Sequence, residues 1–160
     1  MMGVSGSGKS VIGAGLARAL GIDFVEGDHY HPAENVERMA SGVPLTDDDR
    51  AGWLRALAMR IREARDAATG LVITCSALKR SYRDILRAEA SDLRFVFLRG
   101  SRALIAERLA NRSGHFMPPS LLDSQLATLQ EPSPDEAAWV CDISESPADL
   151  VADLVARASA

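Results

Sequence analysis

The chain has 160 residues, 47% of them hydrophobic and 25% charged, and a formal net charge of −4. This length is typical of one globular domain with a substantial core, and the mild negative charge provides no broad basic surface for nucleic acid. Because no apolar run is long enough to span a membrane and no signal peptide precedes the first motif, we expect a cytoplasmic protein without a membrane partner.

The first motif is a phosphate-binding loop. It matches G-x-x-x-x-G-K-[ST] at each constrained position, in the residues Gly3, Val4, Ser5, Gly6, Ser7, Gly8, Lys9 and Ser10. Backbone N–H groups must converge on phosphate oxygens in such a loop, and glycine leaves room for that approach. Lys9 is expected to reach the β- and γ-phosphates of a nucleotide, and the Ser10 hydroxyl to bind Mg²⁺.

The segment after the loop predicts an amphipathic helix. Val11, Ile12, Leu16 and Leu20 lie on roughly one face, and Gly21 stands where the helix should end. A helix N-terminus behind the loop also favours anions. A flexible Gly/Ser segment that merely precedes a helix is the alternative, but it does not account for loop and helix occurring together in the required order.

Short apolar runs then alternate with longer amphipathic segments, which is typical of a parallel sheet covered by helices. Strands are expected within residues 22–28, 71–77, 93–98 and 138–143. Helices are expected within residues 31–42, 46–70, 102–112 and 121–129, and from about residues 81 and 147. In the helix at 46–70, Thr46 and Asp49 predict a capping box, and the predicted core stripe is Trp53, Leu57, Ile61 and Ala64.

Three further features of the sequence concern the core. Only Met1 and Met2 precede the phosphate loop, so either the true start codon lies upstream or the first strand is a stub. Cys75 and Cys141 each fall in an apolar run, which predicts buried thiols in a reducing compartment. Trp53 and Trp139 are expected in the core rather than as stacking platforms for a base.

The placement of acidic residues narrows the class of phosphate-loop protein. The run at residues 71–75 ends without the carboxylate that many such NTPases use to hold Mg²⁺, and no N-K-x-D motif for guanine is present. Glu26 and Asp28 instead follow the strand after the loop helix, as a small-molecule kinase requires. A pair of carboxylates that only caps the next helix is the alternative. His29 and His31 could join these acids in a metal site, or His31 could cap a helix or hydrogen-bond a substrate.

Basic residues are concentrated near the predicted strand ends, where open α/β sheets bind ligands. They are Arg50, Lys79, Arg80 and Arg83. The planar guanidinium of Arg suits a substrate carboxylate, although Arg83 could equally be a solvent-exposed helix residue.

A second basic pair precedes a loop that contains glycine and proline. Arg108 and Arg112 are four residues apart and therefore share a helix face, which could be only a solvated basic stripe. The loop that follows, at about residues 111–120, resembles a kinase lid, which would close over the nucleotide and deliver positive charge to the transferred phosphoryl group.

Five segments resemble the gluconokinase family, relatives of shikimate kinase within the nucleoside-monophosphate-kinase-like fold. They are "MGVSGSGKS", "EGDHYHPAENVERMASGVPLTDDDR", "CSALKRSYRDILR", "RSGHFMP" and "SQLATLQEPSPDE", in order from residue 2 to about residue 145. The resemblance implies one P-loop kinase domain over residues 1–160, with a five-stranded parallel sheet flanked by helices, its first strand truncated, and a lid. It also implies transfer of the ATP γ-phosphate to the 6-hydroxyl of D-gluconate, with Mg²⁺, by a cytoplasmic homodimer.

The resemblance assigns roles to individual residues. The nucleotide would be held by residues Gly3, Ser5, Gly6, Ser7, Gly8, Lys9, Ser10, Val11, Arg108 and Arg112. Gluconate would contact Asp28, His31, Arg50, Lys79, Arg80 and Gln125. Ser10 and Glu26 would act on Mg²⁺, and Lys9, Asp28 and Arg112 would be catalytic, with Asp28 accepting or orienting the sugar hydroxyl proton. Val11 stands where the family typically has threonine, which removes one hydroxyl contact to the α-phosphate.

Two other functions remain open from the sequence. One is a related kinase that acts on shikimate or another sugar acid. The other is a non-catalytic ATP-binding regulatory domain, against which Asp28 and the lid-like segment argue, because a pure binding module needs neither.

Overall fold

The computed structural model describes residues 1–111 and 121–160. The predicted lid and Arg112 therefore lie outside the described residues, apart from Asn111 at the start of that segment. The first half of the chain contains α1 (Lys9–Leu20), β1 (Asp23–Val25), the 3-10 helix η1 (Gly27–Tyr30), α2 (Ala33–Ala40), α3 (Asp47–Asp66) and β2 (Leu71–Ile73). The second half contains α4 (Arg80–Ala88), β3 (Val96–Arg99), α5 (Arg102–Ala110), α6 (Leu122–Thr128), the 3-10 helix η3 (Pro134–Glu136), β4 (Trp139–Asp142) and α7 (Pro147–Ala158).

The strands form two parallel pairs joined by the first residues of the chain. β1 pairs with β2, and β3 pairs with β4. Between the pairs, the Met1 nitrogen donates to the Ile73 carbonyl at 2.8 Å, and Met2 N–H donates to the Val96 carbonyl at 2.8 Å. Met2 also forms a parallel β-bridge with Phe97. The residues before the phosphate loop thus occupy the middle of the sheet.

The sequence predicts five strands with the first one truncated, and the described residues contain four strands and a single β-bridge at Met2. Backbone groups of β3 and of the residues just after β2 find partners there, because Cys75 N–H donates to the Met1 carbonyl and Leu98 N–H to the Met2 carbonyl, each at 3.0 Å. The stub therefore leaves these inward-facing groups paired.

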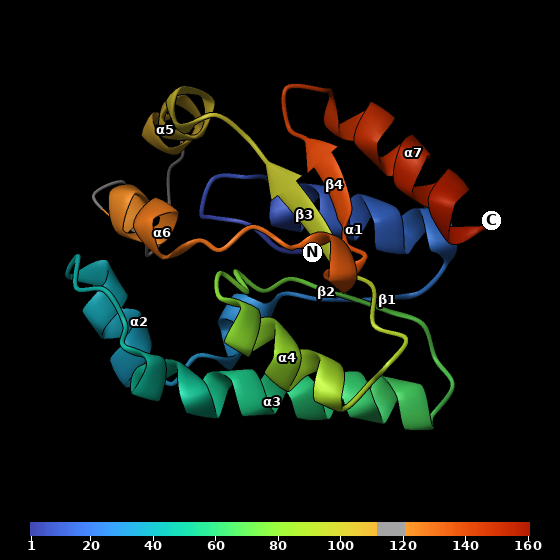
Figure 1. The fold of residues 1–160 in the computed structure, drawn as a ribbon, viewed down its shortest axis with the longest axis horizontal. Coiled ribbons are helices and arrows are strands. Elements are labelled where there is room, and N and C mark those ends of the chain that lie inside the picture. The colour runs from blue at the N-terminus through green and yellow to red at the C-terminus, as the bar shows by residue number, and fades with distance from the viewer. Residues whose placement is uncertain (112–120) are drawn as a thin grey trace.

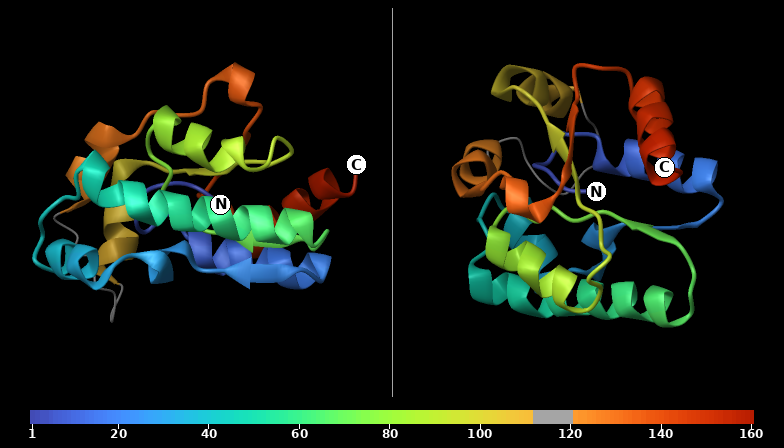
Figure 2. Two further views of the ribbon diagram at one scale, coloured as in Figure 1. Left: turned by 90° about the horizontal axis from the view of Figure 1, so that it is seen from below. Right: turned by 45° about the vertical axis from the view of Figure 1, so that its right-hand side comes forward.

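Helices cover both faces of this sheet, as Figures 1 and 2 show. α3 and α4 lie on one face, where their apolar residues pack with Ile73, Cys75 and Phe97. α1, α5 and α7 pack on the other face around Val72, Leu98 and Ile143. This α/β arrangement confirms the predicted fold class.

Local sequence signals explain where several helices begin. The Thr46 hydroxyl accepts from Asp49 N–H while the Asp49 carboxylate accepts from Thr46 N–H, which confirms the capping box of α3. Ser101 and Ser146 cap α5 and α7 in the same position. The predicted stripe of α3 is buried, with Trp53 1% exposed and Leu57 0% exposed.

Two predictions about apolar side chains had different outcomes. On α1, Ile12 and Leu16 are buried, but Val11 is 65% exposed because it lies toward the cavity described below rather than toward the sheet. Cys75 and Cys141 are both buried free thiols, as predicted. Burial raises the pKa of the Cys75 thiol to about 12, so this group is protonated at neutral pH. In residues 1–111 and 121–160, no helix is long and apolar enough to cross a membrane.

Candidate active site

The phosphate loop has the backbone conformation that its glycines predict. Gly3, Gly6 and Gly8 all have positive φ, of 140°, 83° and 93°. At Gly6 a Cβ atom would also lie 2.8 Å from Leu109 Cγ on α5, so both conformation and space require glycine there. The loop can therefore pass directly against α5 and turn into α1 at Lys9.

Contacts from elsewhere in the chain fix the loop. The Lys9 ammonium donates to the carbonyls of Gly3 and Val4, each at 3.0 Å, so it spans the mouth of its own loop. The Ser5 N–H donates to Gln125 Oε1 on α6 at 2.7 Å, in a buried contact. Gln125, predicted as a substrate residue, thus also supports the nucleotide loop.

Two loop hydroxyls are buried without a hydrogen-bond partner in the described part of the chain. They belong to Ser5, which is 8% exposed, and Ser7, which is fully buried. An unpaired buried hydroxyl has a free-energy cost that a phosphate oxygen or its hydration water could remove. The loop residues therefore fit an anionic group, and those of ATP are the kind that such a loop binds.

A cavity of about 660 Å³ opens beside the loop and is large enough for a nucleotide and a small acid. Twelve predicted site residues border it: Ser5, Gly6, Gly8, Lys9, Ser10, Val11, Glu26, Asp28, His31, Arg50, Arg108 and Gln125. Gly3 and Ser7 lie behind this surface in the loop itself, where Gly3 N–H donates to the Ser76 carbonyl at 3.2 Å.

Oxygen groups that could bind Mg²⁺ or its hydration water border the same cavity. They are the Ser10 hydroxyl and the carboxylates of Glu26 and Asp28, which flank Gly27 at the end of β1. Among the described residues no three His, Cys, Asp or Glu side chains gather into a metal site, so the proposed cluster with His29 and His31 does not form there. One hydroxyl and two carboxylates fit Mg²⁺, which usually keeps several waters and takes one or two protein ligands together with substrate phosphates.

His31 stacks on Trp53, with ring centroids 4.1 Å apart and planes 16° from parallel. The Trp53 indole N–H is held in turn by the Gly27 carbonyl at 2.8 Å. Burial lowers the pKa of His31 to about 4, with Asp28 opposing the shift and Arg50 adding to it. His31 is therefore a neutral ring at the cavity wall at pH 7, and its Nδ1 has no hydrogen-bond partner in the described residues.

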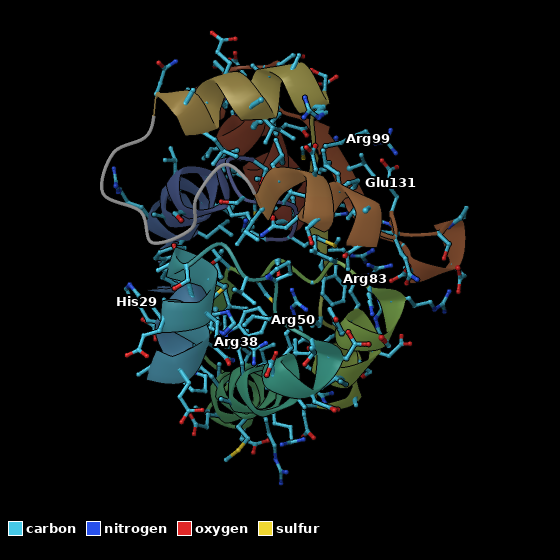
Figure 3. All side chains as sticks on the ribbon, turned by 90° about the vertical axis from the view of Figure 1, so that its left-hand side faces the viewer. His29, Arg38, Arg50, Arg83, Arg99 and Glu131 are labelled. Atoms are coloured by element: carbon cyan, nitrogen blue, oxygen red, sulfur yellow. The ribbon has the colours of Figure 1, made fainter. Side chains whose placement is uncertain are left out.

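Two arginines border the cavity from opposite sides. Arg50, near the start of α3, donates to the carbonyls of Leu45 and Thr46 and extends beside α2, as Figure 3 shows. Arg108 on α5 donates to the Ile143 carbonyl at 2.7 Å and lies close to the phosphate loop. Both helices thus bring a positive charge to the cavity.

Lys79 and Arg80, predicted as substrate residues, do not border this cavity. Lys79 donates to both carboxylate oxygens of Asp47, at 2.7 and 2.8 Å. Arg80 pairs with Asp135 at 2.7 Å on the surface. Their assignment to substrate stays a prediction, and the geometry favours Arg50.

Arg83 is not the solvent-exposed helix residue that one alternative expected, and it does not border the cavity. Its side chain is 1% exposed and lies in a buried ion pair with Glu136, with Nε to Oε2 at 2.5 Å. Figure 3 places it beside α4 and away from Arg50. Glu136 belongs to a capping box with Ser133, a local pattern that gives no sign of a partner on α4.

Several residues at the cavity were not predicted from the sequence. Trp53 was expected only in the core, yet its indole also borders the cavity through the stack on His31. Met39 and Leu45 give the cavity an apolar border, and they pack with Leu121 in a cluster separate from the two main cores. The position of Met39 on the buried side of α2 was the only available signal, and it could not distinguish a cavity wall from ordinary packing.

The fold and the site together define the class of protein. A central stub enters a glycine-rich loop and then a helix, and carboxylates at the next strand end face the same cavity. A family model described as an AAA domain matches residues 1–132, which is most of the chain. This is a P-loop kinase.

Comparison with known proteins identifies the family. The gluconokinase of Gluconobacter oxydans is 54% identical over 136 residues, covering 85% of this chain and 76% of that protein. The thermoresistant gluconokinase of Escherichia coli is 44% identical over 163 residues, covering 97% and 89%. The crystal structure of a gluconokinase from Sinorhizobium meliloti superposes with a TM-score of 0.87 at 49% identity, covering 97% of this chain and 87% of that one. The chain belongs to the gluconokinase family.

Proposed function

We propose that the protein transfers the γ-phosphate of ATP to the 6-hydroxyl of D-gluconate, which gives 6-phospho-D-gluconate and ADP. One observation carries the proposal: a single cavity is bordered by the phosphate loop, by Asp28 and by Arg50. These are the groups needed for a nucleotide, a reacting hydroxyl and a substrate carboxylate. The family relationship supports gluconate as the acid.

The nucleotide side of the cavity supplies positive charge and N–H donors. Lys9 would exchange its two carbonyl acceptors for phosphate oxygens, and Arg108 lies within reach of the same loop. Such fixed charges stabilise the transition state of phosphoryl transfer more than they stabilise the bound substrate. Val11, exposed at the cavity, offers no hydroxyl to the α-phosphate.

We also propose that Ser10 and Glu26 hold Mg²⁺ together with the phosphates. The ion would neutralise charge on the β- and γ-phosphates when bound. Asp28, on the other side of Gly27, would orient the sugar hydroxyl and take its proton as the bond to phosphorus forms. The two carboxylates thus have separate tasks although they are two residues apart.

The acid side of the cavity selects the substrate. Arg50 would pair with the gluconate carboxylate through its planar guanidinium. Neutral His31 and Gln125 would hydrogen-bond hydroxyl groups, since both carry groups that can donate or accept. A sugar acid with one carboxylate and several hydroxyls matches this set better than an apolar acid does.

The experiment that tests the proposal measures ADP release with a panel of acids that includes D-gluconate and shikimate. D-gluconate should be the preferred substrate, and the phosphorylated product should be identified by NMR. Faster turnover of shikimate would make the substrate assignment wrong. ATP binding without turnover of any acid would favour a regulatory domain.

Two further proposals concern the state of the protein. We propose a homodimer, which the family resemblance supports and which light scattering at several concentrations would test. We also propose a cytoplasmic location, which the two buried free thiols favour because they require no oxidising compartment.

A further inference from the structure

Thr74 is a buried polar residue beside the cavity that the reaction described above does not use. It directly follows β2 and is 1% exposed. Its N–H continues the pairing with β1 by donating to the Val25 carbonyl at 3.0 Å. Its hydroxyl therefore lies next to the turn that carries Glu26 and Asp28.

The hydroxyl of Thr74 makes two hydrogen bonds with that turn. Gly27 N–H donates to Thr74 Oγ1 at 2.9 Å in a buried contact, and Thr74 Oγ1 contacts Glu26 Oε1. A backbone N–H can only donate, so the hydroxyl oxygen accepts from Gly27. Its single proton is then available for the Glu26 carboxylate, which can only accept when ionised. One side chain thus fixes both the backbone and the carboxylate.

The turn has little freedom to move away from this contact. A Cβ atom on Gly27 would lie 1.9 Å from the Thr74 carbonyl oxygen, so the two backbones touch. The Gly27 carbonyl accepts from Trp53 Nε1 at 2.8 Å. Both polar groups of Gly27 are therefore held by side chains from other elements, and the directions of Glu26 and Asp28 are held with them.

We propose that Thr74 is a positioning residue for phosphoryl transfer: its hydroxyl holds the Glu26 carboxylate at the cavity wall, directed toward the hydrated Mg²⁺ of the bound nucleotide. The proposal rests on the proposed function. It also explains how the site works although no carboxylate follows β2. The acid comes from the neighbouring strand β1, and the residue at the end of β2 supplies the hydrogen bond that orients it.

A purely structural role for Thr74 would have different consequences. If its hydroxyl served only to satisfy Gly27 N–H, removing it would lower stability without changing the dependence of nucleotide binding on Mg²⁺. If it orients Glu26, the Mg²⁺ dependence changes even in a folded protein. The two roles are separated by measuring binding rather than turnover.

The test compares Thr74→Val, which keeps the shape and removes the hydroxyl, with Thr74→Ser, which keeps the hydroxyl. ATP binding is measured by calorimetry over a range of Mg²⁺ concentrations, with no sugar acid present. In Thr74→Val the Mg²⁺ concentration for half-maximal enhancement should rise by roughly 10-fold or more, as is usual when a residue that orients a metal's ligand is lost. Thr74→Ser should stay close to the wild type.

Two further variants make the result specific. Adding Glu26→Gln to Thr74→Val should cause little additional change, because the two residues act on Mg²⁺ through one carboxylate. If Thr74→Val does not fold, Thr74→Cys replaces it, since the thiol has nearly the same shape and donates only weakly.

An unchanged Mg²⁺ dependence in folded Thr74→Val or Thr74→Cys would overturn the proposal, as would a Thr74→Ser defect equal to that of Thr74→Val. These outcomes are independent of the substrate assignment. That assignment fails only if the wild-type protein does not phosphorylate D-gluconate, and gluconate is absent from the binding experiment.

Discussion

Arg83 and Glu136 form a bidentate ion pair inside the protein, with Nε to Oε2 at 2.5 Å and Nη2 to Oε1 at 2.7 Å. Both side chains are 1% exposed. Arg83 also donates to the carbonyls of Ala77 and Gln130, at 3.0 and 2.9 Å. The pair thus ties α4 and the segment before it to the chain between α6 and β4.

Removing one partner of this pair should strongly destabilise the fold. Arg83→Met or Glu136→Gln leaves buried polar groups without their partners, which typically costs about 3–5 kcal/mol. The free energy of unfolding, measured by urea titration, checks this. The double variant Arg83→Met with Glu136→Leu should lose less than the sum of the single variants. Arg102→Ala is the matched control, because its pair with Asp123 is exposed and should contribute little. Equal losses at the two pairs would contradict the prediction.

His31 should make stability depend on pH between about 4 and 6.5. The unfolded chain binds a proton at His31 below about pH 6.5, but burial holds the folded pKa near 4. Between these pH values the unfolded state binds more protons than the folded state. The contribution of His31 to the free energy of unfolding is therefore fully present above pH 6.5 and is lost as the pH falls toward 4.

Unfolding titrations of the wild type at pH 7 and pH 5 test this, with His31→Phe as the matched variant. Phenylalanine keeps a ring against Trp53 but cannot bind a proton. Its stability should fall less between the two pH values than that of the wild type. The Glu136 carboxylate, whose pKa Arg83 lowers to about 2, contributes mainly below pH 4.5 and does not interfere. Parallel slopes in the two proteins would show that His31 is not the group responsible.

Lys9→Ala should remove most turnover while the protein stays folded. The Lys9 ammonium donates to the Gly3 and Val4 carbonyls of its own loop, and it supplies charge rather than core packing. Loss of one charge-stabilising group typically costs about 10²–10³-fold in kcat. Circular dichroism and kcat are measured together. Arg102→Ala, which removes a cation paired with Asp123 at the surface, is the control and should retain nearly full activity.

Asp28→Asn and Glu26→Gln should fail in different ways. Asp28→Asn keeps the shape but loses the proton acceptor, so kcat should fall by about 10²–10⁴-fold while the KM for ATP changes little. Glu26→Gln should instead raise the Mg²⁺ concentration required for half-maximal rate. Both variants are assayed over a Mg²⁺ titration. Rescue of Asp28→Asn by extra Mg²⁺ would reassign Asp28 to the metal.

Arg50→Ala should raise the KM for gluconate far more than the KM for ATP. The change would remove the guanidinium that pairs with the gluconate carboxylate and leave the nucleotide contacts in place. Arg80→Ala is the comparison, since Arg80 pairs with Asp135 at the surface. Steady-state kinetics with each substrate varied in turn measure both effects. A larger gluconate defect in Arg80→Ala would restore the sequence-based assignment of Arg80 to the substrate.

Much of the fold followed from local patterns. The phosphate loop, the capping box at Thr46 and Asp49, and the buried stripe of α3 each depend on residues close together in the chain, and each is present. The carboxylates Glu26 and Asp28 were predicted at the site because they follow the strand after the loop helix, and both border the cavity. These features need no knowledge of distant contacts.

The remaining features depend on distant contacts. Arg83 and Glu136 are 53 residues apart, and no local pattern joins them. Lys79 and Arg80 were predicted to contact the substrate. They instead form ion pairs at the surface with Asp47 and Asp135, which belong to other parts of the chain. Thr74 belongs to no motif in the sequence. Its hydroxyl accepts from Gly27 N–H only because the fold brings Gly27 against it.

The central position of Met1–Gly3 has a consequence for the order of folding. Backbone groups of this segment pair with Ile73, Ser76 and Val96, so its hydrogen bonds close loops of roughly 70 to 95 residues. Contacts that distant form late, because the chain must lose much conformational freedom before they stabilise anything. The helices and the β1–β2 and β3–β4 pairs can assemble first, whereas the phosphate loop takes its shape only when both halves of the sheet close on the stub. The capacity to bind nucleotide should therefore emerge last as the protein folds, together with the joining of the two halves.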